Sequence, residues 1–200
     1  KVQDVADFNG DGKADILWRH DSGTTNIWLM DGGTQIGGTN TNSQAGNNWK
    51  VLGAGDFNGD GKADILWRNN DGRAHIWFMD GDQSQPGSGD AIFTLDNSWK
   101  FEEIGDFNGD HKADILWRND NGQTQISLMD GRSLIGGGNT VSQTSNVWHI
   151  EDVGDYNGDG KSDILWRHDD GATFMWLMDG IEDIGSGYTN SQTSLSWHIV

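Results

Sequence analysis

The stretch Asp7-Phe-Asn-Gly-Asp-Gly-Lys-Ala-Asp15 is an acidic nine-residue loop, and the chain repeats it three more times. The later copies begin at Asp56, Asp106 and Asp155, so consecutive copies lie 49, 50 and 49 residues apart. Each copy places oxygen-bearing side chains at its first, third, fifth and ninth positions. A fixed period near 50 residues is typical of a repeat architecture, in which one supersecondary unit is copied and stacked.

Each unit reads as a series of short strands around its loop. In the second unit, residues 49–55 form an extended run into the loop, and residues 63–68 are rich in β-formers. Asn69-Asn-Asp-Gly72 is a hairpin turn signal, residues 73–79 form a third strand, and a weaker fourth strand follows. The third strand is apolar on both faces, which predicts a sheet covered on both sides by its neighbours.

These patterns predict an all-β fold, a β-propeller built from four blades of four strands each. We expect one domain over residues 1–200, with repeat units at about 1–48, 49–98, 99–147 and 148–200. Each blade would carry its acidic loop between its first two strands. Helical solenoids fit poorly, because no unit contains a long segment with helical periodicity.

Composition narrows the class of protein. The net charge is −18 and the hydrophobic content is 34%, but eleven tryptophans recur at matching positions and predict a packed core. The acidic balance argues against nucleic acid as a partner. No apolar run approaches the ~18 residues that span a membrane. There is no cysteine, and the chain begins at Lys1 without a signal peptide, as expected of a processed or excised form.

The acidic loop has the ligand chemistry of a calcium site. Ca²⁺ takes six to eight oxygen ligands, and alternate residues of a tight loop can supply them to one centre. In the first loop these would be the side chains of Asp7, Asn9, Asp11 and Asp15, with the backbone carbonyl of Lys13 and water. Gly12 fits the left-handed turn that such a loop requires. An EF-hand is rejected, because an EF-hand loop has a glutamate at its twelfth position, and the twelfth residue counted from Asp7 is Trp18. An ordinary turn without metal is the remaining alternative.

The block Asp-Phe-Asn-Gly-Asp-Gly-Lys-Ala-Asp-Ile-Leu-Trp-Arg resembles the FG-GAP (or VCBS) repeat of integrin α-subunit propellers and many secreted bacterial proteins. The resemblance covers all four units and implies about four structural Ca²⁺ ions, with metal ligands at the same loop positions in every unit. In the later units these are Asp56, Asn58, Asp60, Lys62, Asp64, Asp106, Asn108, Asp110, Lys112, Asp114, Asp155, Asn157, Asp159, Lys161 and Asp163. His111 replaces the turn glycine in the third loop, which we expect to bind more weakly.

The tryptophans fall into three sets. Trp18 and its counterparts lie in the second strand, where we expect them to pack between neighbouring blades. Each is followed by an arginine, which we expect to bridge to acidic turn residues such as Asp31 or Asp80. Trp28, Trp77 and Trp176 lie in the third strand, where the third unit has Ser127. The third set follows polar stretches and suits stacking on sugar rings, although packing at the strand start is the favoured interpretation: Trp49, Trp99, Trp148 and Trp197.

Together these features predict a secreted or cell-surface, calcium-stabilised propeller that binds glycans at several shallow sites without catalysis. Some family members are lectins, and the alternative is a protein-binding adhesion module or an appendage of a larger secreted protein or enzyme. No nucleophile elbow or zinc-protease motif is visible, so we expect no enzyme. Four blades could close alone, form a homodimer, or belong to a longer array.

Overall fold

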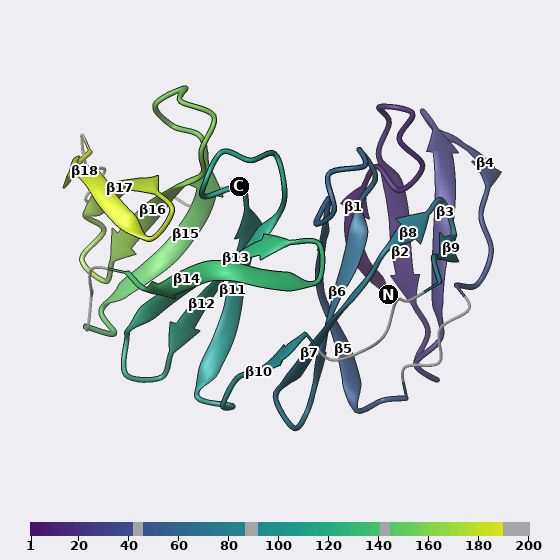
Figure 1. Cartoon of the computed structure of the whole chain (residues 1–200), viewed down its shortest axis with the longest axis horizontal. Coiled ribbons are helices and arrows are strands. Elements are labelled where there is room, and N and C mark those ends of the chain that lie inside the picture. Colours follow the sequence, from purple (N-terminus) through teal and green to yellow (C-terminus); the bar gives the residue numbers. More distant parts are fainter. Residues whose placement is uncertain (42–45, 87–91, 141–144, 190–200) are drawn as a thin grey trace. The chain divides into compact units, whose positions relative to one another are not determined.

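The computed structural model describes residues 1–41, 46–86, 92–140 and 145–189. Within these ranges the chain forms strands and turns, grouped into four four-stranded antiparallel sheets and one two-stranded sheet (Figure 1). The all-β prediction is therefore confirmed. Trp197 lies outside the described residues, so the structure does not test its predicted role.

The strands follow the repeat in chain order. The first sheet holds β1 (Val2–Ala6), β2 (Asp15–Arg19), β3 (Thr25–Asp31) and β4 (Thr34–Gly37). The third holds β11 (Trp99–Gly105), β12 (Asp114–Asn119), β13 (Thr124–Asp130) and β14 (Ser133–Asn139). The fourth holds β15 (Trp148–Gly154), β16 (Asp163–His168), β17 (Thr173–Asp179) and β18 (Glu182–Tyr188).

The second sheet departs from this order. It runs β10 (Phe93–Thr94), β7 (Arg73–Trp77), β6 (Asp64–Asn69) and β5 (Trp49–Gly55). Its third strand is interrupted at Phe78, after which β8 (Met79–Asp80) pairs with β9 (Gln83–Ser84) as a separate ribbon. The predicted weak fourth strand of this unit is thus divided between β9 and β10.

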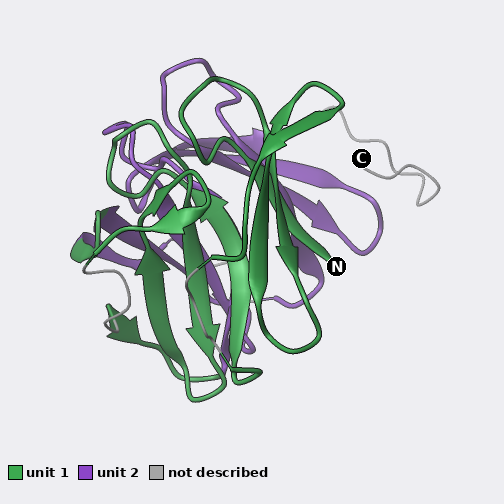
Figure 2. Ribbon diagram, turned by 90° about the vertical axis from the view of Figure 1, so that its right-hand side faces the viewer, with its two compact units in different colours: residues 1–97, 130–134 green, residues 98–129, 135–200 purple. Residues whose placement is uncertain are grey.

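The chain divides into two compact units, which Figure 2 colours separately. Unit 1 comprises residues 1–97 and 130–134, and unit 2 comprises residues 98–129 and 135–200. Unit 1 contains the first two acidic loops and unit 2 the last two. Each unit therefore holds two consecutive repeats and can be understood by itself.

Both units build their core in the same way. In unit 1, Trp67 of β6 is 1% exposed and packs with apolar side chains of the first repeat, namely Phe8, Leu17 and Ile27. In unit 2, Trp166 of β16 is fully buried and packs with the corresponding residues of the third repeat, namely Phe107, Leu116 and Ile126. The second-strand tryptophans thus join one repeat to the one before it, as the packing interpretation predicts.

Backbone hydrogen bonds fix the same junction. In unit 1 the carbonyl oxygens of Asp7 and Phe8 accept from the amides of Ala63, at 2.7 Å, and Gly81, at 2.8 Å. In unit 2 the carbonyl oxygens of Asp106 and Phe107 accept from Ser162, at 2.6 Å, and Gly180, at 2.7 Å. The acidic loop of each earlier repeat is therefore bonded directly to the repeat that follows it within its unit.

Candidate metal loops and an inter-repeat groove

Each acidic loop closes around its first aspartate. The two carboxylate oxygens of Asp7 accept backbone N–H groups from Gly10, at 2.8 Å, and Gly12, at 2.7 Å. The side-chain oxygen of Asn9 accepts from the Asp11 amide, and Asp11 accepts from the Lys13 amide, both at 2.9 Å. The other three loops repeat this pattern. Backbone donors from Gly160 and its neighbours lower the pKa of Asp155 accordingly.

The loop also requires a left-handed residue at its sixth position. Gly12 and Gly61 have φ values of 81°, and Gly160 has a φ of 85°. His111 occupies the same position with a φ of 64°, and it is the one non-glycine residue with positive φ among the residues that the structure describes. The strained backbone predicted for His111 is confirmed, while its effect on metal affinity remains a prediction.

The ninth residue of the loop has a structural role that the sequence interpretation missed. Asp64 is fully buried, and its carboxylate accepts the amides of Phe57, at 3.1 Å, and Met79, at 3.0 Å. It therefore ties the start of the loop to the end of the third strand. Asp15, Asp114 and Asp163 accept the corresponding pairs of amides. An acidic residue directly before an apolar strand was the available signal for this burial.

The loop carboxylates act on one another electrostatically. Burial raises the pKa of Asp64 to about 8, the two backbone donors oppose this rise, and the charges of Asp60 and Asp56 increase it. Burial likewise raises the pKa of Asp114 to about 7, again with contributions from the other two aspartates of its loop. The other two carboxylates of the loop thus disfavour the charged form of the ninth-position aspartate, and a cation among them would relieve this repulsion.

The donor set of the loops fits a hard cation in its chemistry. Carboxylate, amide and carbonyl oxygens are the ligands that Ca²⁺ prefers, and each hydrogen-bonded carboxylate oxygen keeps a second lone pair. Among the described residues, no group of three or more His, Cys, Asp or Glu side chains is arranged as a metal site. The expected ligand set also contains asparagine side chains, such as that of Asn9, and the backbone carbonyl oxygens of the loop lysines, which are not among these four residue types. Calcium binding therefore stays a prediction.

The basic residues near the loops make different contacts from those expected. The ammonium groups of the loop lysines pair with the aspartate that ends the third strand: Lys13 with Asp31 at 3.1 Å, and Lys161 with Asp179 at 2.7 Å. The arginines were expected to bridge to Asp31 or Asp80, but these two aspartates pair with Lys13 and Lys62. The Arg19 guanidinium instead donates to the carbonyl oxygen of Trp49, at 2.6 Å.

The arginine contacts recur along the chain. Arg68 donates to the carbonyl oxygens of Leu95 and Asp96, both at 3.1 Å, and Arg118 donates to that of Ser145, at 3.3 Å. Arg19 also lies over the Trp67 ring, 5.0 Å from its centroid. Each of these arginines therefore holds the backbone that leads into or begins a following repeat, since a guanidinium suits several carbonyl acceptors at once.

The predicted sugar-binding tryptophans lie at strand starts and are half-buried. The Trp49 ring packs against His75 with centroids 4.1 Å apart, and the Arg73 guanidinium lies 5.5 Å from its centroid. Trp148 contacts three aromatic side chains of its own sheet, namely His168, Phe174 and Tyr188. Trp99 begins β11 in the same way. Part of each characterised ring is thus used in packing.

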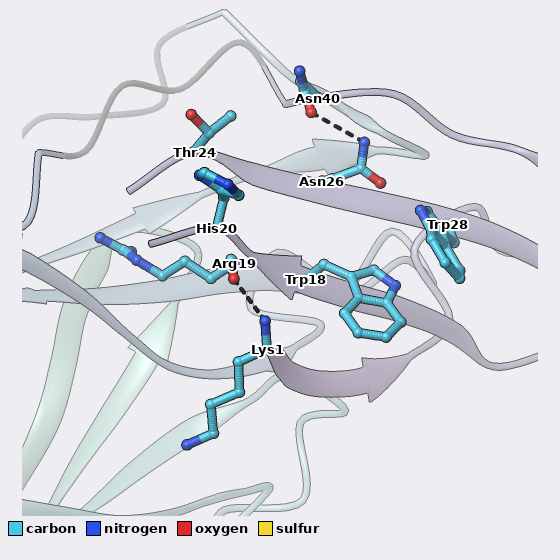
Figure 3. A pocket seen from close by; sticks show the side chains of 8 residues that line it. All are labelled: Lys1, Trp18, Arg19, His20, Thr24, Asn26, Trp28 and Asn40. Atoms are coloured by element: carbon cyan, nitrogen blue, oxygen red, sulfur yellow. Dashed lines mark hydrogen bonds between the residues drawn. The ribbon is translucent and has the colours of Figure 1, made fainter. Parts of the chain in front are cut away.

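Two hollows lie next to each other in unit 1. A groove of about 420 Å³ runs along Trp49, and it is lined by residues from the turn after β2 and from the segment entering β5, including Arg19, Asp21, Asn47 and Lys50. A cavity of about 480 Å³ lies against the first sheet, walled by Trp18 and Trp28 (Figure 3). The groove combines an aromatic ring with exposed polar side chains, whereas the cavity has indole walls.

Comparison with known families assigns the repeats. The model of the FG-GAP-like repeat matches residues 7–67, 56–117 and 106–166, which together cover most of the chain. The chain therefore belongs to the FG-GAP-like repeat family. Repeats of this family are typically non-catalytic and form propeller-type folds. No helix in the described part of the chain is long and apolar enough to cross a membrane.

Two matches among solved structures have low sequence identity to this chain. Raptor from Chaetomium thermophilum matches with a TM-score of 0.53 and 12% identity, over 95% of this chain and 17% of that one. The C-terminal WD40 domain of Sif2 matches with a TM-score of 0.40 and 14% identity, over 88% of this chain and 55% of that one. The chain thus spans a minor part of the Raptor chain and about half of the other. A search of curated proteins finds no significant match.

Proposed function

We propose that this chain is a calcium-stabilised β-propeller module that binds carbohydrate, without catalysis, in grooves between consecutive repeats. The observation that carries the proposal is the groove along Trp49, where an aromatic edge lies beside exposed charged and amide side chains. Sugars present both C–H faces, which pack on aromatic rings, and hydroxyl groups, which pair with carboxylates, amides and guanidinium groups.

Polar residues of this groove come from two consecutive repeats. Arg19, Asp21 and Asn47 belong to the first repeat, and Lys50 follows Trp49 at the start of the second. Asp21, Asn47 and Lys50 are exposed, so their hydrogen-bonding groups can exchange water for hydroxyls of a ligand. Because the junction recurs with the repeat, several weak sites on one chain would gain avidity on a polysaccharide.

Calcium enters the proposal as a structural ion held by the acidic loops. The loops bond directly to the following repeat, and their clustered carboxylates oppose one another when no cation is present. Bound cations would therefore stabilise both the loop and the junction on which the groove depends. Loops of modest affinity suit extracellular fluid, where calcium is millimolar, and we propose an extracellular or cell-surface location on this ground.

A glycan array in about 2 mM calcium tests the proposal, with the same array after chelation as the comparison. We expect Asp21→Ala combined with Asn47→Ala to weaken glycan binding at least about tenfold, since two polar contacts are removed without touching the core. Gln35→Ala, on the exposed outer strand β4, is the matched control and should bind like the parent. Absence of glycan binding by a folded, calcium-loaded chain would refute the carbohydrate proposal.

A second candidate function is adhesion to another protein. Three repeats expose an isoleucine at the same position of their outermost strand: Ile36 in β4, Ile135 in β14 and Ile184 in β18, each between 56% and 58% exposed. The second repeat has Gln85 at this position. Exposed aliphatic side chains on edge strands suit pairing with an extended segment of a partner. Charge substitution of the three isoleucines should abolish such binding while leaving glycan binding unchanged.

A further inference from the structure

The two acidic loops of each compact unit are joined through one shared peptide group. In unit 1 this is the peptide between Lys62 and Ala63, the seventh and eighth residues of the second loop. Its N–H group donates to the backbone carbonyl oxygen of Asp7, the first residue of the first loop, at 2.7 Å. Its own carbonyl oxygen, that of Lys62, belongs to the calcium ligand set expected for the second loop. The same peptide therefore bonds one loop and would bind the cation of the other.

Unit 2 contains the same link between its two loops. The N–H group of Ser162 donates to the backbone carbonyl oxygen of Asp106 at 2.6 Å, and the carbonyl group of that peptide belongs to Lys161. Both bonds lie at the short end of the range for N–H···O hydrogen bonds. The link is made by backbone atoms, so it is present whether alanine or serine follows the lysine.

The side chain of the same lysine makes a second contact between the loops. A Cβ atom on Gly10, the fourth residue of the first loop, would lie 3.3 Å from Cγ and 3.7 Å from Cε of Lys62. In unit 2, a Cβ atom on Gly109 would lie 3.3 and 3.5 Å from the same atoms of Lys161. The aliphatic part of each lysine thus covers the turn of the preceding loop.

The covered turn is the part of the first loop that orders its first carboxylate. The amide of Gly10 donates to the Asp7 carboxylate at 2.8 Å, and Gly10 has a φ of 76°. In unit 2 the amide of Gly109 donates to Asp106 at 2.7 Å, and the φ is 77°. The first aspartate therefore takes part in both contacts, because its carbonyl oxygen accepts from the shared peptide and its carboxylate accepts from the covered glycine.

Electrostatics favours a joint response of the two loops. The shared peptide would become a better donor when its carbonyl oxygen is bound to a cation, because hydrogen-bonded groups in a chain polarise one another. A firmer bond to Asp7 would leave less freedom for the first loop to lose when it binds its own ion. Each loop carries three carboxylates, so a loop that holds one Ca²⁺ keeps a net negative charge and does not repel the second ion.

We propose that the two calcium sites of each unit bind their ions with positive cooperativity, coupled through the shared peptide and the lysine that covers the preceding loop. The inference rests on calcium binding by the loops, which is part of the function proposed above. Lys62 and Lys161 are then positioning residues for the loop before their own, as well as members of their own loop. The four expected sites would form two pairs, and each pair would respond to calcium over a narrower concentration range than a single site.

Isothermal titration calorimetry with calcium tests the coupling in unit 1. In the two-site variant, Asp110→Ala and Asp159→Ala remove a fifth-position ligand from each loop of unit 2. Adding Asp11→Ala or Asp60→Ala then gives two one-site variants. Coupled sites typically change each other's affinity about 5–150-fold, so the two-site variant should exceed the product of the one-site affinities at least about fivefold. The mirror set, which starts from Asp11→Ala with Asp60→Ala, repeats the measurement on unit 2.

Lys62→Ala and Lys13→Ala separate the coupling from a simple loss of charge. Each substitution removes a loop lysine and its ion pair, which joins Lys62 to Asp80 at 2.5 Å and Lys13 to Asp31 at 3.1 Å. Lys62 lies between the two loops of unit 1, against Gly10, whereas Lys13 belongs to the first loop itself. In the two-site background we expect Lys62→Ala to lower the cooperative factor at least about twofold and Lys13→Ala to leave it unchanged.

The results that would overturn the proposal can be told apart. If the one-site variants bind calcium and the two-site variant gives only the product of their affinities, the loops bind independently and the coupling alone is wrong. If no variant binds calcium while circular dichroism shows a folded chain, the calcium part of the proposed function fails as well. Equal effects of Lys62→Ala and Lys13→Ala on the cooperative factor would overturn the role given to the covering lysine.

Discussion

His111 offers the sharpest test of the loop geometry, because it is a side chain where the other loops have glycine. Its φ of 64° lies in the left-handed region, which costs a non-glycine residue roughly 1–2 kcal/mol, with histidine at the lower end. Its side chain is 92% exposed, so little packing is lost on removal. The backbone amide of His111 donates a hydrogen bond to the Asp106 carboxylate, at 2.8 Å, and glycine makes the same hydrogen bond in the other loops, so its loss is not expected on substitution.

We therefore expect His111→Gly to stabilise the protein. Glycine loses more conformational freedom on folding, which offsets roughly 0.5–1 kcal/mol of the relieved strain. The net gain should be about 0.5 kcal/mol, or roughly 1–2 °C in unfolding midpoint for a chain of this size. The reciprocal change in the same unit, Gly160→His at a φ of 85°, meets no atom within 4 Å of its Cβ and should destabilise by a similar amount.

Urea and thermal unfolding at fixed protein and calcium concentration would measure both variants. Calcium titration should in addition give a tighter third site in His111→Gly if the loops bind the ion. A destabilisation of about 1 kcal/mol or more by His111→Gly would refute the reasoning, since it would mean that the imidazole contributes more than its backbone costs.

Three further predictions follow from the same geometry. Asp64→Asn should lower the free energy of unfolding in urea by about 2–4 kcal/mol, because one buried backbone amide loses its acceptor. The exposed control Asp80→Asn should change it by less than about 1 kcal/mol. Equal effects of the two substitutions would contradict the structural role of the buried carboxylate. Gly38→Ala should cost about 2 kcal/mol or more, since its Cβ would lie 2.0 Å from the Ile27 carbonyl oxygen, whereas Gly33→Ala has open space and should be tolerated in thermal unfolding. Chelation of calcium should lower the unfolding midpoint, with about 2.7 kcal/mol lost per site held at 100 times its dissociation constant, and an unchanged midpoint would rule out the metal assignment.

Features encoded within a few neighbouring residues could be read from the sequence. The four loops, the strands beside them and the left-handed sixth position depend on local turn chemistry, and the structure confirms each. The packing of Trp67 and Trp166 was also predictable, because a tryptophan within an apolar strand has few alternatives to burial.

Contacts over longer distances could not be read in this way. The carboxylate of Asp64 bonds Met79, 15 residues away, and a ligand pattern at the same position concealed this second role. The arginines were expected to find carboxylates but bind carbonyl oxygens of following segments, which sequence spacing does not reveal. The interruption at Phe78 is likewise hidden, since an apolar run continues through it.

The two backbone carbonyl groups of the acidic loop that bond to the next repeat bear on how the number of repeats in such chains can change during evolution. Asp7 and Phe8 present acceptors to the next repeat, while Ala63 and Gly81 of that repeat present the donors. The same two edges recur at Asp106 and Ser162 in unit 2. A duplicated or deleted unit of DNA that encodes one whole repeat would therefore rejoin a donor edge to an acceptor edge. Gene rearrangement could alter the number of repeats in this protein without creating a new kind of junction.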